Sequence, residues 1–246
     1  DRELKKLPRV YFRLFSLDPI QDRRFFIAHK ERWRHFEPFS REKGFTESQK
    51  LLVIGDRGIG KSSLINVAQM EIQNTRLIRL EGESQEGPLG ELARIFGVKN
   101  TNSAILGALR KNGATIVMDN VDQMLHKRKL EQFERLFEVI KQSPHKAHWI
   151  LSITSFNLDP LDRAFKIRSL FNKLIDLNEI NLETSKEIIL GRHRLSGLDI
   201  EYPKTLISDL AMKVGFSTED EMFFRVLYER SHGHIRHWIY LWILSL

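Results

Sequence analysis

The sequence predicts an α/β fold, in which helices cover a parallel sheet of about five strands, followed by a small all-helical part. Between residues 46 and 180, short apolar runs alternate with segments whose apolar residues recur every three or four positions. From residue 182 onward only the helical periodicity continues. Alternation of strands with helices is typical of parallel sheets that are covered on both faces.

Five apolar runs are the expected strands, at residues 50–55, 75–82, 114–120, 148–155 and 172–178. The expected helices between them cover Ser62 to Gln73, residues 88–98 and 103–113, a long helix after residue 120, and residues 159–171. Four helices are expected after the sheet, at 182–195, 203–214, 218–230 and 232–246. The chain should therefore have three parts: a mostly helical segment over 1–45, an α/β domain over 46–180, and a helical domain over 181–246.

Composition narrows the class of protein. Of the 246 residues, 41% are hydrophobic and 29% are charged, as is usual for a globular protein with a normal core. The chain has no cysteine, which excludes disulfides and thiolate metal sites and favours the cytoplasm. Its first residues contain no apolar signal sequence, and because it starts at Asp1 we expect a fragment of a longer protein.

The last eight residues, IYLWILSL at 239–246, form an apolar run. A membrane-spanning helix needs about 20 residues, so we expect the end of a packed helix and no membrane contact within this chain. The alternative is the start of a membrane segment, which would make the chain the cytoplasmic part of a membrane-attached protein.

Positive charge is concentrated near the N-terminus. The chain has a formal net charge of +7, and residues 1–50 contribute 13 Lys and Arg against 8 Asp and Glu. Basic and aromatic residues are interleaved in HKERWRHF, at 29–36, as in some nucleic-acid-binding surfaces. Such a run is also found on solvated helix faces with buried aromatic rings. Nucleic acid is therefore a possible partner of this segment.

A glycine-rich loop follows the first expected strand. It fits the pattern G-x-x-x-x-G-K-[ST] without a mismatch, through Gly55, Asp56, Arg57, Gly58, Ile59, Gly60, Lys61 and Ser62. In such a loop the main-chain N–H groups and the positive end of the next helix hold phosphates, and the lysine contacts the terminal ones. Ser63 belongs to this candidate site or is simply a residue of the first helical turn. The motif predicts a three-layer P-loop NTPase fold.

Two residues are candidates for holding Mg²⁺. The hydroxyl of Ser62 can bind the ion directly, and Asp119, at the end of the third expected strand, can hold it through its water shell. An acidic residue after an apolar strand is a weak signal by itself. Together with the loop it predicts a site for a nucleoside triphosphate with Mg²⁺.

With these elements the chain resembles the additional-strand ATPases, AAA+ and the related STAND class, over about residues 45 to 246. The resemblance implies that a polar residue at the end of the fourth strand positions the attacking water; Thr154 and Ser155 are the candidates, with Asn157 slightly beyond. It also implies a helical lid, and EIILGRHRLSG at 187–197 is similar to the lid helices of origin-recognition-type members, although its His and Arg residues could be plain surface.

The resemblance further implies two functional arginines. One follows a helix before the last strand and reaches the γ-phosphate of a neighbouring subunit; Arg168 is the first candidate and Arg163 the second. The other lies in the final lid helix and senses the γ-phosphate; here SHGHIRHW makes Arg236 the candidate. Each could instead be an exposed surface residue. The first role requires a homo-oligomer assembled head to tail.

One departure from the family pattern affects the expected chemistry. Many AAA+ proteins have a glutamate after the Mg²⁺-binding aspartate as the base that activates water, whereas this chain has Asn120. An amide cannot accept a proton at neutral pH. Asp122 lies where STAND proteins often have a second acidic residue. If its carboxylate faces the phosphates, slow hydrolysis is expected; if it only caps the next helix, the protein would bind ATP and barely cleave it.

The sequence thus predicts an ATP-binding switch, slowly hydrolysing, that couples the exchange of ATP and ADP to oligomerisation or partner binding. The alternative is a nucleotide-gated DNA-binding or scaffold module with little or no hydrolysis. A GTPase is rejected, because NKLID at 172–176 places the aspartate of N-K-x-D one residue late and D-x-x-G is absent. A small-molecule kinase would share the loop but would not be expected to carry the helical tail.

Overall fold

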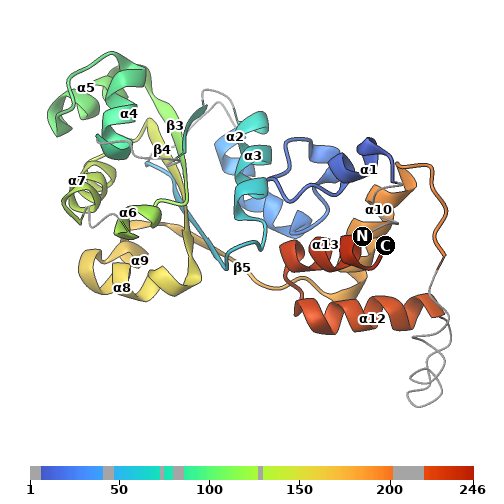
Figure 1. Cartoon of the computed structure of the whole chain (residues 1–246). Helices are drawn as coiled ribbons and strands as arrows, with labels where there is room; N and C mark the ends of the chain where they lie inside the picture. The colour runs from blue at the N-terminus through green and yellow to red at the C-terminus, as the bar shows by residue number, and fades with distance from the viewer. Residues whose placement is uncertain (1–6, 41–46, 73–74, 80–85, 127–129, 202–218) are drawn as a thin grey trace. The chain divides into compact units, whose positions relative to one another are not determined.

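The structure is a computed structural model, and it describes residues 7–40, 47–72, 75–79, 86–126, 130–201 and 219–246 (Figure 1). Contacts divide the chain into two compact units. We call them the sheet unit, formed by Glu31–Arg57 and Lys61–Leu177, and the helical unit, formed by Asp1–Lys30, Gly58–Gly60 and Asn178–Leu246. The contacts thus group the first 30 residues with the C-terminal helices rather than as a separate part.

A five-stranded parallel sheet forms the middle of the sheet unit. Its strands lie in the order β2-β3-β4-β1-β5. They are β1 (Lys50–Gly55), β2 (Thr75–Arg79), β3 (Ala114–Asp119), β4 (Ala147–Thr154) and β5 (Lys173–Leu177). The predicted sheet of about five strands is confirmed, and residues 80–82 of the expected second strand lie outside the described residues.

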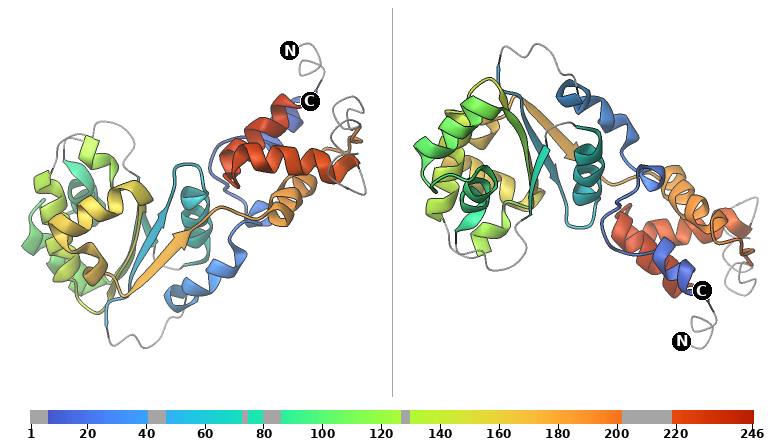
Figure 2. Two further views of the ribbon diagram at one scale, coloured as in Figure 1. Left: turned by 90° about the horizontal axis from the view of Figure 1, so that it is seen from below. Right: turned by 90° about the horizontal axis from the view of Figure 1, so that it is seen from above.

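Helices cover both faces of this sheet, as Figure 2 shows. The connection from β1 to β2 crosses the sheet in one direction, and the connections from β2 to β3, β3 to β4 and β4 to β5 cross it in the other. Because such crossovers are right-handed, the first connection lies on one face and the other three on the opposite face. The first face holds α3 (Lys61–Glu71), and the second holds α4 (Gly87–Phe96), α5 (Asn102–Asn112), α7 (Leu130–Lys141), α8 (Ser155–Phe165) and α9 (Ile167–Leu170).

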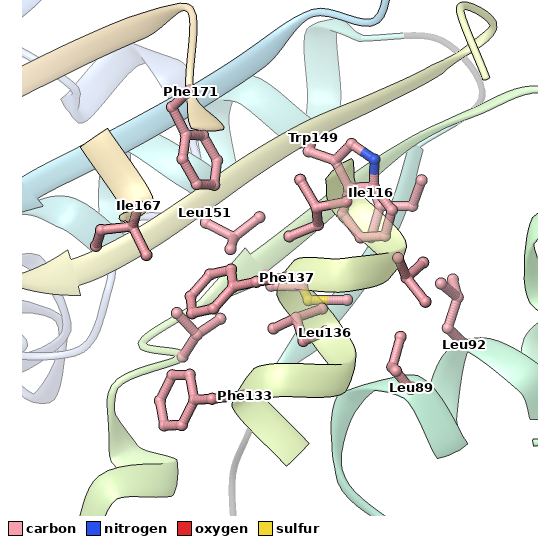
Figure 3. Close-up of a cluster of buried hydrophobic side chains, with 14 of the residues drawn as sticks. Leu89, Leu92, Ile116, Phe133, Leu136, Phe137, Trp149, Leu151, Ile167 and Phe171 are labelled. Atoms are coloured by element: carbon pink, nitrogen blue, oxygen red, sulfur yellow. The ribbon is translucent and has the colours of Figure 1, made fainter. Parts of the chain in front are cut away.

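The main hydrophobic core lies under this second group of helices (Figure 3). Alternate residues of a strand point to opposite faces, so Ile116 and Leu151 from the sheet meet Leu136 and Phe137 from α7. Trp149 is completely buried there, and its Nε1 donates to Ser143 Oγ at 2.8 Å. Burial on both faces explains why β1, β3 and β4 read as nearly continuous apolar runs.

One of the expected helices is interrupted. Instead of one helix over 159–171, α8 ends at Phe165 and α9 begins at Ile167, because Lys166 between them is left-handed with φ of 54°. The long helix after residue 120 is observed as α6 (Gln123–His126) and α7, and residues 127–129 between them lie outside the described residues. The break at Lys166 is not marked in the sequence by a glycine.

The helical unit contains α1 (Arg9–Leu14), η2 (Arg23–Phe25), α10 (Leu182–Arg194), α12 (Glu219–Ser231) and α13 (Ile235–Leu244). Short helices η3 (Lys30–His35) and α2 (Glu37–Ser40) follow η2 along the chain. The helix expected at 203–214 lies outside the described residues.

A buried polar chain ties the N-terminal segment into the helical unit. Tyr11 on α1 shares a hydrogen bond with His193 Nδ1 at 3.0 Å and accepts one from Trp242 Nε1 at 2.9 Å. Burial raises the pKa of Tyr11. The C-terminal apolar run is the end of α13, with Trp238 and Trp242 buried. Within the described part of the chain, no helix is long and apolar enough to cross a membrane.

Candidate nucleotide-binding site

The glycine-rich loop joins the end of β1, at Gly55, to the start of α3, at Lys61. Two of its glycines have positive φ, +91° at Gly58 and +112° at Gly60, where an L side chain would be strained. The loop therefore needs these glycines for its main-chain path. It leads into an 11-residue helix, whose N-terminal N–H groups and dipole favour an anion.

Lys61 lies buried at the first position of α3, with a relative exposure of 5%. Its Nζ donates to the carbonyl oxygens of Gly55 at 2.7 Å and Asp56 at 3.0 Å. Burial lowers the pKa of Lys61, and the carboxylates of Asp122, Asp119 and Asp56 oppose this effect. The loop thus holds a desolvated ammonium group that an anion can stabilise.

The structure brings the two candidate Mg²⁺ residues together at the C-terminal ends of the strands. Asp119 ends β3 and is buried, and its Oδ1 accepts a hydrogen bond from Ser152 Oγ at 2.6 Å. Ser62 Oγ lies 3.5 Å from Nδ2 of Asn120, the next residue after Asp119. A hydroxyl and a carboxylate suit Mg²⁺, which takes few protein oxygens and completes its shell with water and phosphate. No cluster of three or more His, Asp or Glu metal ligands occurs among the described residues.

Ser152 is a residue of this site that sequence reasoning missed. Its hydroxyl donates to Asp119 Oδ1 and accepts the main-chain N–H of Asn120 at 2.8 Å, so it joins β4 to the end of β3. Asn120 is left-handed, with φ of 52°, a conformation that asparagine tolerates better than most residues. The signal for Ser152 was a hydroxyl directly after the apolar residues WIL and before Ile153 in the strand.

Asp122 is linked to Thr154, the last residue of β4, and to Asn157 in α8. Its Oδ2 accepts hydrogen bonds from the Thr154 N–H at 3.2 Å, the Thr154 Oγ1 at 2.5 Å and the Asn157 Nδ2 at 2.7 Å. Asp122 is 3% exposed, and its Oδ1 is buried without a hydrogen-bond partner among the described residues. Thr154 and Asn157 therefore form one polar cluster with Asp122, whereas Ser155 begins α8 without a described bond to that carboxylate.

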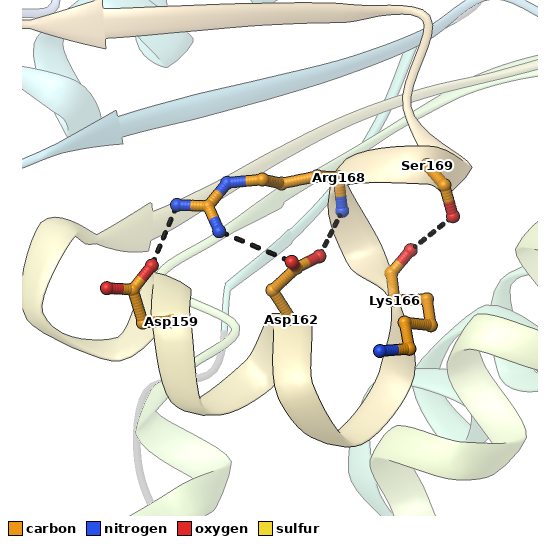
Figure 4. Close-up of polar contacts among 5 residues, drawn as sticks. All are labelled: Asp159, Asp162, Lys166, Arg168 and Ser169. Atoms are coloured by element: carbon orange, nitrogen blue, oxygen red, sulfur yellow. Dashed lines mark hydrogen bonds and ion pairs between the residues drawn. The ribbon is translucent and has the colours of Figure 1, made fainter.

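The candidate arginines lie in different units. Arg168, in the sheet unit, is on α9 and forms ion pairs with Asp159 at 2.8 Å and Asp162 at 3.2 Å (Figure 4). Arg163 is exposed near the end of α8. Arg236 is on α13 in the helical unit, where its N–H donates to the carbonyl oxygen of Gly58 at 3.3 Å.

A scan against protein-family models matches residues 51–179 to the ATPase family associated with various cellular activities, AAA. The match covers more than half of the chain, from β1 to just past β5. The protein belongs to the AAA family. The resemblance found in the sequence is thereby confirmed at the level of the family. A search of curated proteins found no match to the chain.

Solved structures share the fold at low sequence identity. The Aeropyrum pernix ORC1 protein, solved in complex with DNA, matches with a TM-score of 0.60 and 14% identity over 96% of this chain and 63% of its own. A Walker-type ATPase of Pyrococcus abyssi matches with a TM-score of 0.50 and 17% identity, over 91% of this chain and 73% of its own. The A. pernix ORC2 protein, solved as ADPNP–ADP complexes, matches with a TM-score of 0.51 and 15% identity, over 74% and 55%. The AAA chain thus has an origin-recognition-like fold and spans less than two thirds of the length of the ORC1 chain.

Proposed function

We propose that this AAA protein binds ATP with Mg²⁺ at the glycine-rich loop and hydrolyses it slowly. We further propose that the bound nucleotide controls oligomerisation or the binding of a partner. The proposal rests on one arrangement at the C-terminal ends of the strands. Lys61 is buried beside the loop, Ser62 and Asp119 lie near each other, and Asp122 is bonded to Thr154. Membership of an ATPase family supports ATP as the ligand.

Each residue of the loop has a defined role in this proposal. The main-chain N–H groups of residues 56 to 60 and the start of α3 hold the phosphates. Lys61 exchanges its bonds with the carbonyl oxygens of Gly55 and Asp56 for bonds to phosphate oxygens. Ser62 and Asp119 hold Mg²⁺, which, when bound, neutralises charge on the phosphates.

Slow hydrolysis follows from the groups around the expected position of the attacking water. Asn120 cannot accept a proton, and Oδ2 of Asp122 already accepts three hydrogen bonds. We therefore assign Asp122 to positioning: it fixes Thr154 and Asn157, which orient the water. Weak activation of water suits a switch, of the kind that STAND proteins represent, better than a motor.

Two arginines would supply the remaining contacts to the γ-phosphate, one of them through assembly. Arg168 is exposed on α9 and would reach the γ-phosphate held by a second copy of the chain. Arg236 would sense the same phosphate within one chain, and the bond from its N–H to Gly58 supports this role. Because Arg168 would act from a second copy, its stabilisation of developing charge would make activity depend on protein concentration.

Isothermal titration calorimetry with a non-hydrolysable ATP analogue and Mg²⁺ tests the proposal. We expect micromolar binding, lost in Lys61→Met and kept in the control Lys111→Met, which changes an exposed lysine at the end of α5. Circular dichroism should show all three proteins folded. Absence of heat with well-folded wild-type protein at millimolar nucleotide would overturn the proposed function.

A second candidate function, nucleotide-gated DNA binding with little hydrolysis, is favoured by one cluster of positive charge. Burial lowers the pKa of His35, and Arg34, Lys173 and Arg32 lower it further, so these side chains lie close together at the β5 edge of the sheet. Phosphate contacts by such a cluster would make DNA affinity fall steeply with salt. Binding that is absent or indifferent to salt would remove this candidate.

A further inference from the structure

The guanidinium group of Arg168 lies between two carboxylates of its own chain (Figure 4). Its Nη2 donates to Asp159 Oδ1 at 2.8 Å, and its Nη1 donates to Asp162 Oδ2 at 3.2 Å. The main-chain N–H of Arg168 also donates to Asp162 Oδ1 at 2.8 Å. Asp162 therefore fixes both the main chain and the side chain of this arginine.

The local backbone creates this arrangement. Asp159 and Asp162 are three residues apart on α8, so they share one face of that helix. The left-handed Lys166 turns the chain between α8 and α9, so that Arg168 meets that face. Ser169 Oγ donates to the Lys166 carbonyl oxygen at 2.8 Å and closes the turn.

The two carboxylates hold the side chain of Arg168 in one orientation and still leave it able to bind an anion. The hydrogen bond with Asp159 is the main cause that raises the pKa of Arg168, and the main-chain N–H of Arg168 is the main cause that lowers the pKa of Asp162. The two carboxylates use two of the five N–H donors of the guanidinium. The side chain is 44% exposed, so the other donors can bind an anion brought by another molecule.

We propose that Asp159 and Asp162 are positioning residues that hold Arg168 in the orientation in which it meets the γ-phosphate bound by a second copy of this chain. This inference rests on the proposed function. The alternative is a latch that keeps Arg168 away from the phosphate. An exposed ion pair shifts an equilibrium by no more than about fivefold, whereas an arginine finger raises turnover by about a thousandfold or more. Two such pairs are too weak to block the finger, but they can remove most of the side chain's rotamer freedom before assembly.

A complementation assay tests the proposal in the full chain. Arg168→Ala serves as the recipient, which binds ATP but lacks the finger, and Lys61→Ala serves as the donor, which supplies Arg168 but holds no nucleotide. Donors carrying Asp159→Asn, Asp162→Asn or both are compared with a donor carrying Glu91→Gln. That control removes the ion pair between Glu91 and Arg94 on α4, which is also exposed.

We expect the unmodified donor and the Glu91→Gln donor to restore turnover equally. The double Asp→Asn donor should restore it about three- to tenfold less at saturating ATP and donor. The KM for ATP, the donor concentration at half-maximal activity and the melting temperature should stay unchanged, since a merely structural role would shift them. Full turnover with the double Asp→Asn donor would overturn this inference alone. Full turnover of Arg168→Ala without any donor would overturn the finger role in the proposed function as well.

Discussion

The hydroxyl of Thr154 donates to Asp122 Oδ2 at 2.5 Å, so the last residue of β4 is bonded to the acidic residue that follows β3. This bond links the C-terminal ends of two adjacent strands, at the side of the sheet where the glycine-rich loop begins. It makes Asp122 part of the candidate water-orienting group.

We therefore expect Asp122→Asn to slow ATP hydrolysis much more than it weakens nucleotide binding. An asparagine in this place presents N–H donors to groups that are themselves donors, so the variant should lose about 1–3 kcal/mol of stability. Turnover should fall about tenfold or more, while affinity for the ATP analogue changes less than about threefold. Single-turnover hydrolysis and calorimetry measure the two effects.

The control for that variant is Asp176→Asn, on an exposed position of β5. It should change neither the turnover nor the affinity for the ATP analogue. A double-mutant cycle with Thr154→Val should show non-additive losses, because the two residues share one hydrogen bond. Additive losses would contradict the joint role of Asp122 and Thr154.

Replacement of Ser152 by alanine tests the link between Asp119 and Mg²⁺. Ser152→Ala leaves Asp119 Oδ1 and the Asn120 N–H without this partner in a buried place, which should cost about 1–3 kcal/mol of stability. Because Asp119 also loses its orientation, we expect weaker binding of the ATP analogue with Mg²⁺ and nearly unchanged binding in EDTA.

Ser143→Ala is the matched control for this variant. Ser143 also bridges two groups, the Val139 carbonyl oxygen and Trp149 Nε1, but it does so at the other end of β4. It should lower thermal stability by a similar amount without changing the effect of Mg²⁺ on affinity. An equal loss of Mg²⁺ dependence in both variants would show that destabilisation alone explains the result.

The sequence was sufficient for those parts of the fold that depend on local pattern. All five strands appear within a few residues of the predicted bounds. Burial on both faces makes β1, β3 and β4 short apolar runs, whereas residues of the edge strand β5 alternate between exposed and buried. The loop motif is equally local, since positive φ at Gly58 and Gly60 needs glycine. The break at Lys166 was missed because lysine gives no sign of a left-handed conformation.

Contacts between distant residues could not be predicted in the same way. The pairing of Ser152 with Asp119 spans 33 positions and depends on the order of strands in the sheet. Sequence reasoning also left two roles open for Asp122, a catalytic base or a helix cap, whereas the structure shows its bonds to Thr154 and Asn157. Likewise, the partners of Arg168 became visible only when the turn at Lys166 was known.

His35 gives a prediction about pH for the DNA-binding candidate. Its pKa is lowered by burial first and then by Arg34, Lys173 and Arg32. A bound polyanion offsets those positive charges, so the pKa of His35 should rise in the complex and binding should take up a proton. DNA affinity should therefore increase as pH falls from about 7 to about 5.5, around the ordinary histidine pKa.

His35→Gln should flatten this pH dependence, and His237→Gln, in the helical unit, should not. Fluorescence anisotropy with labelled duplex DNA at fixed ionic strength measures both. The same slope in wild type and His35→Gln would show that another group takes up the proton.

Asn120 limits hydrolysis in the proposed function, and its backbone conformation determines which substitutions can test this role. With φ of 52° the position tolerates Asn and Asp, whereas glutamate there would be strained by about 1 kcal/mol or more. Asp has the shape of Asn and adds a carboxylate close to Ser62 Oγ, which lies 3.5 Å from Asn120 Nδ2.

We therefore expect Asn120→Asp to raise turnover about tenfold or more at unchanged stability, and Asn120→Glu to raise it less and to lower the melting temperature. Steady-state phosphate release and thermal melts measure these effects, with Asn112→Asp at the end of α5 as the control. If Asn120→Asp stays as slow as wild type, a step other than activation of water limits the reaction.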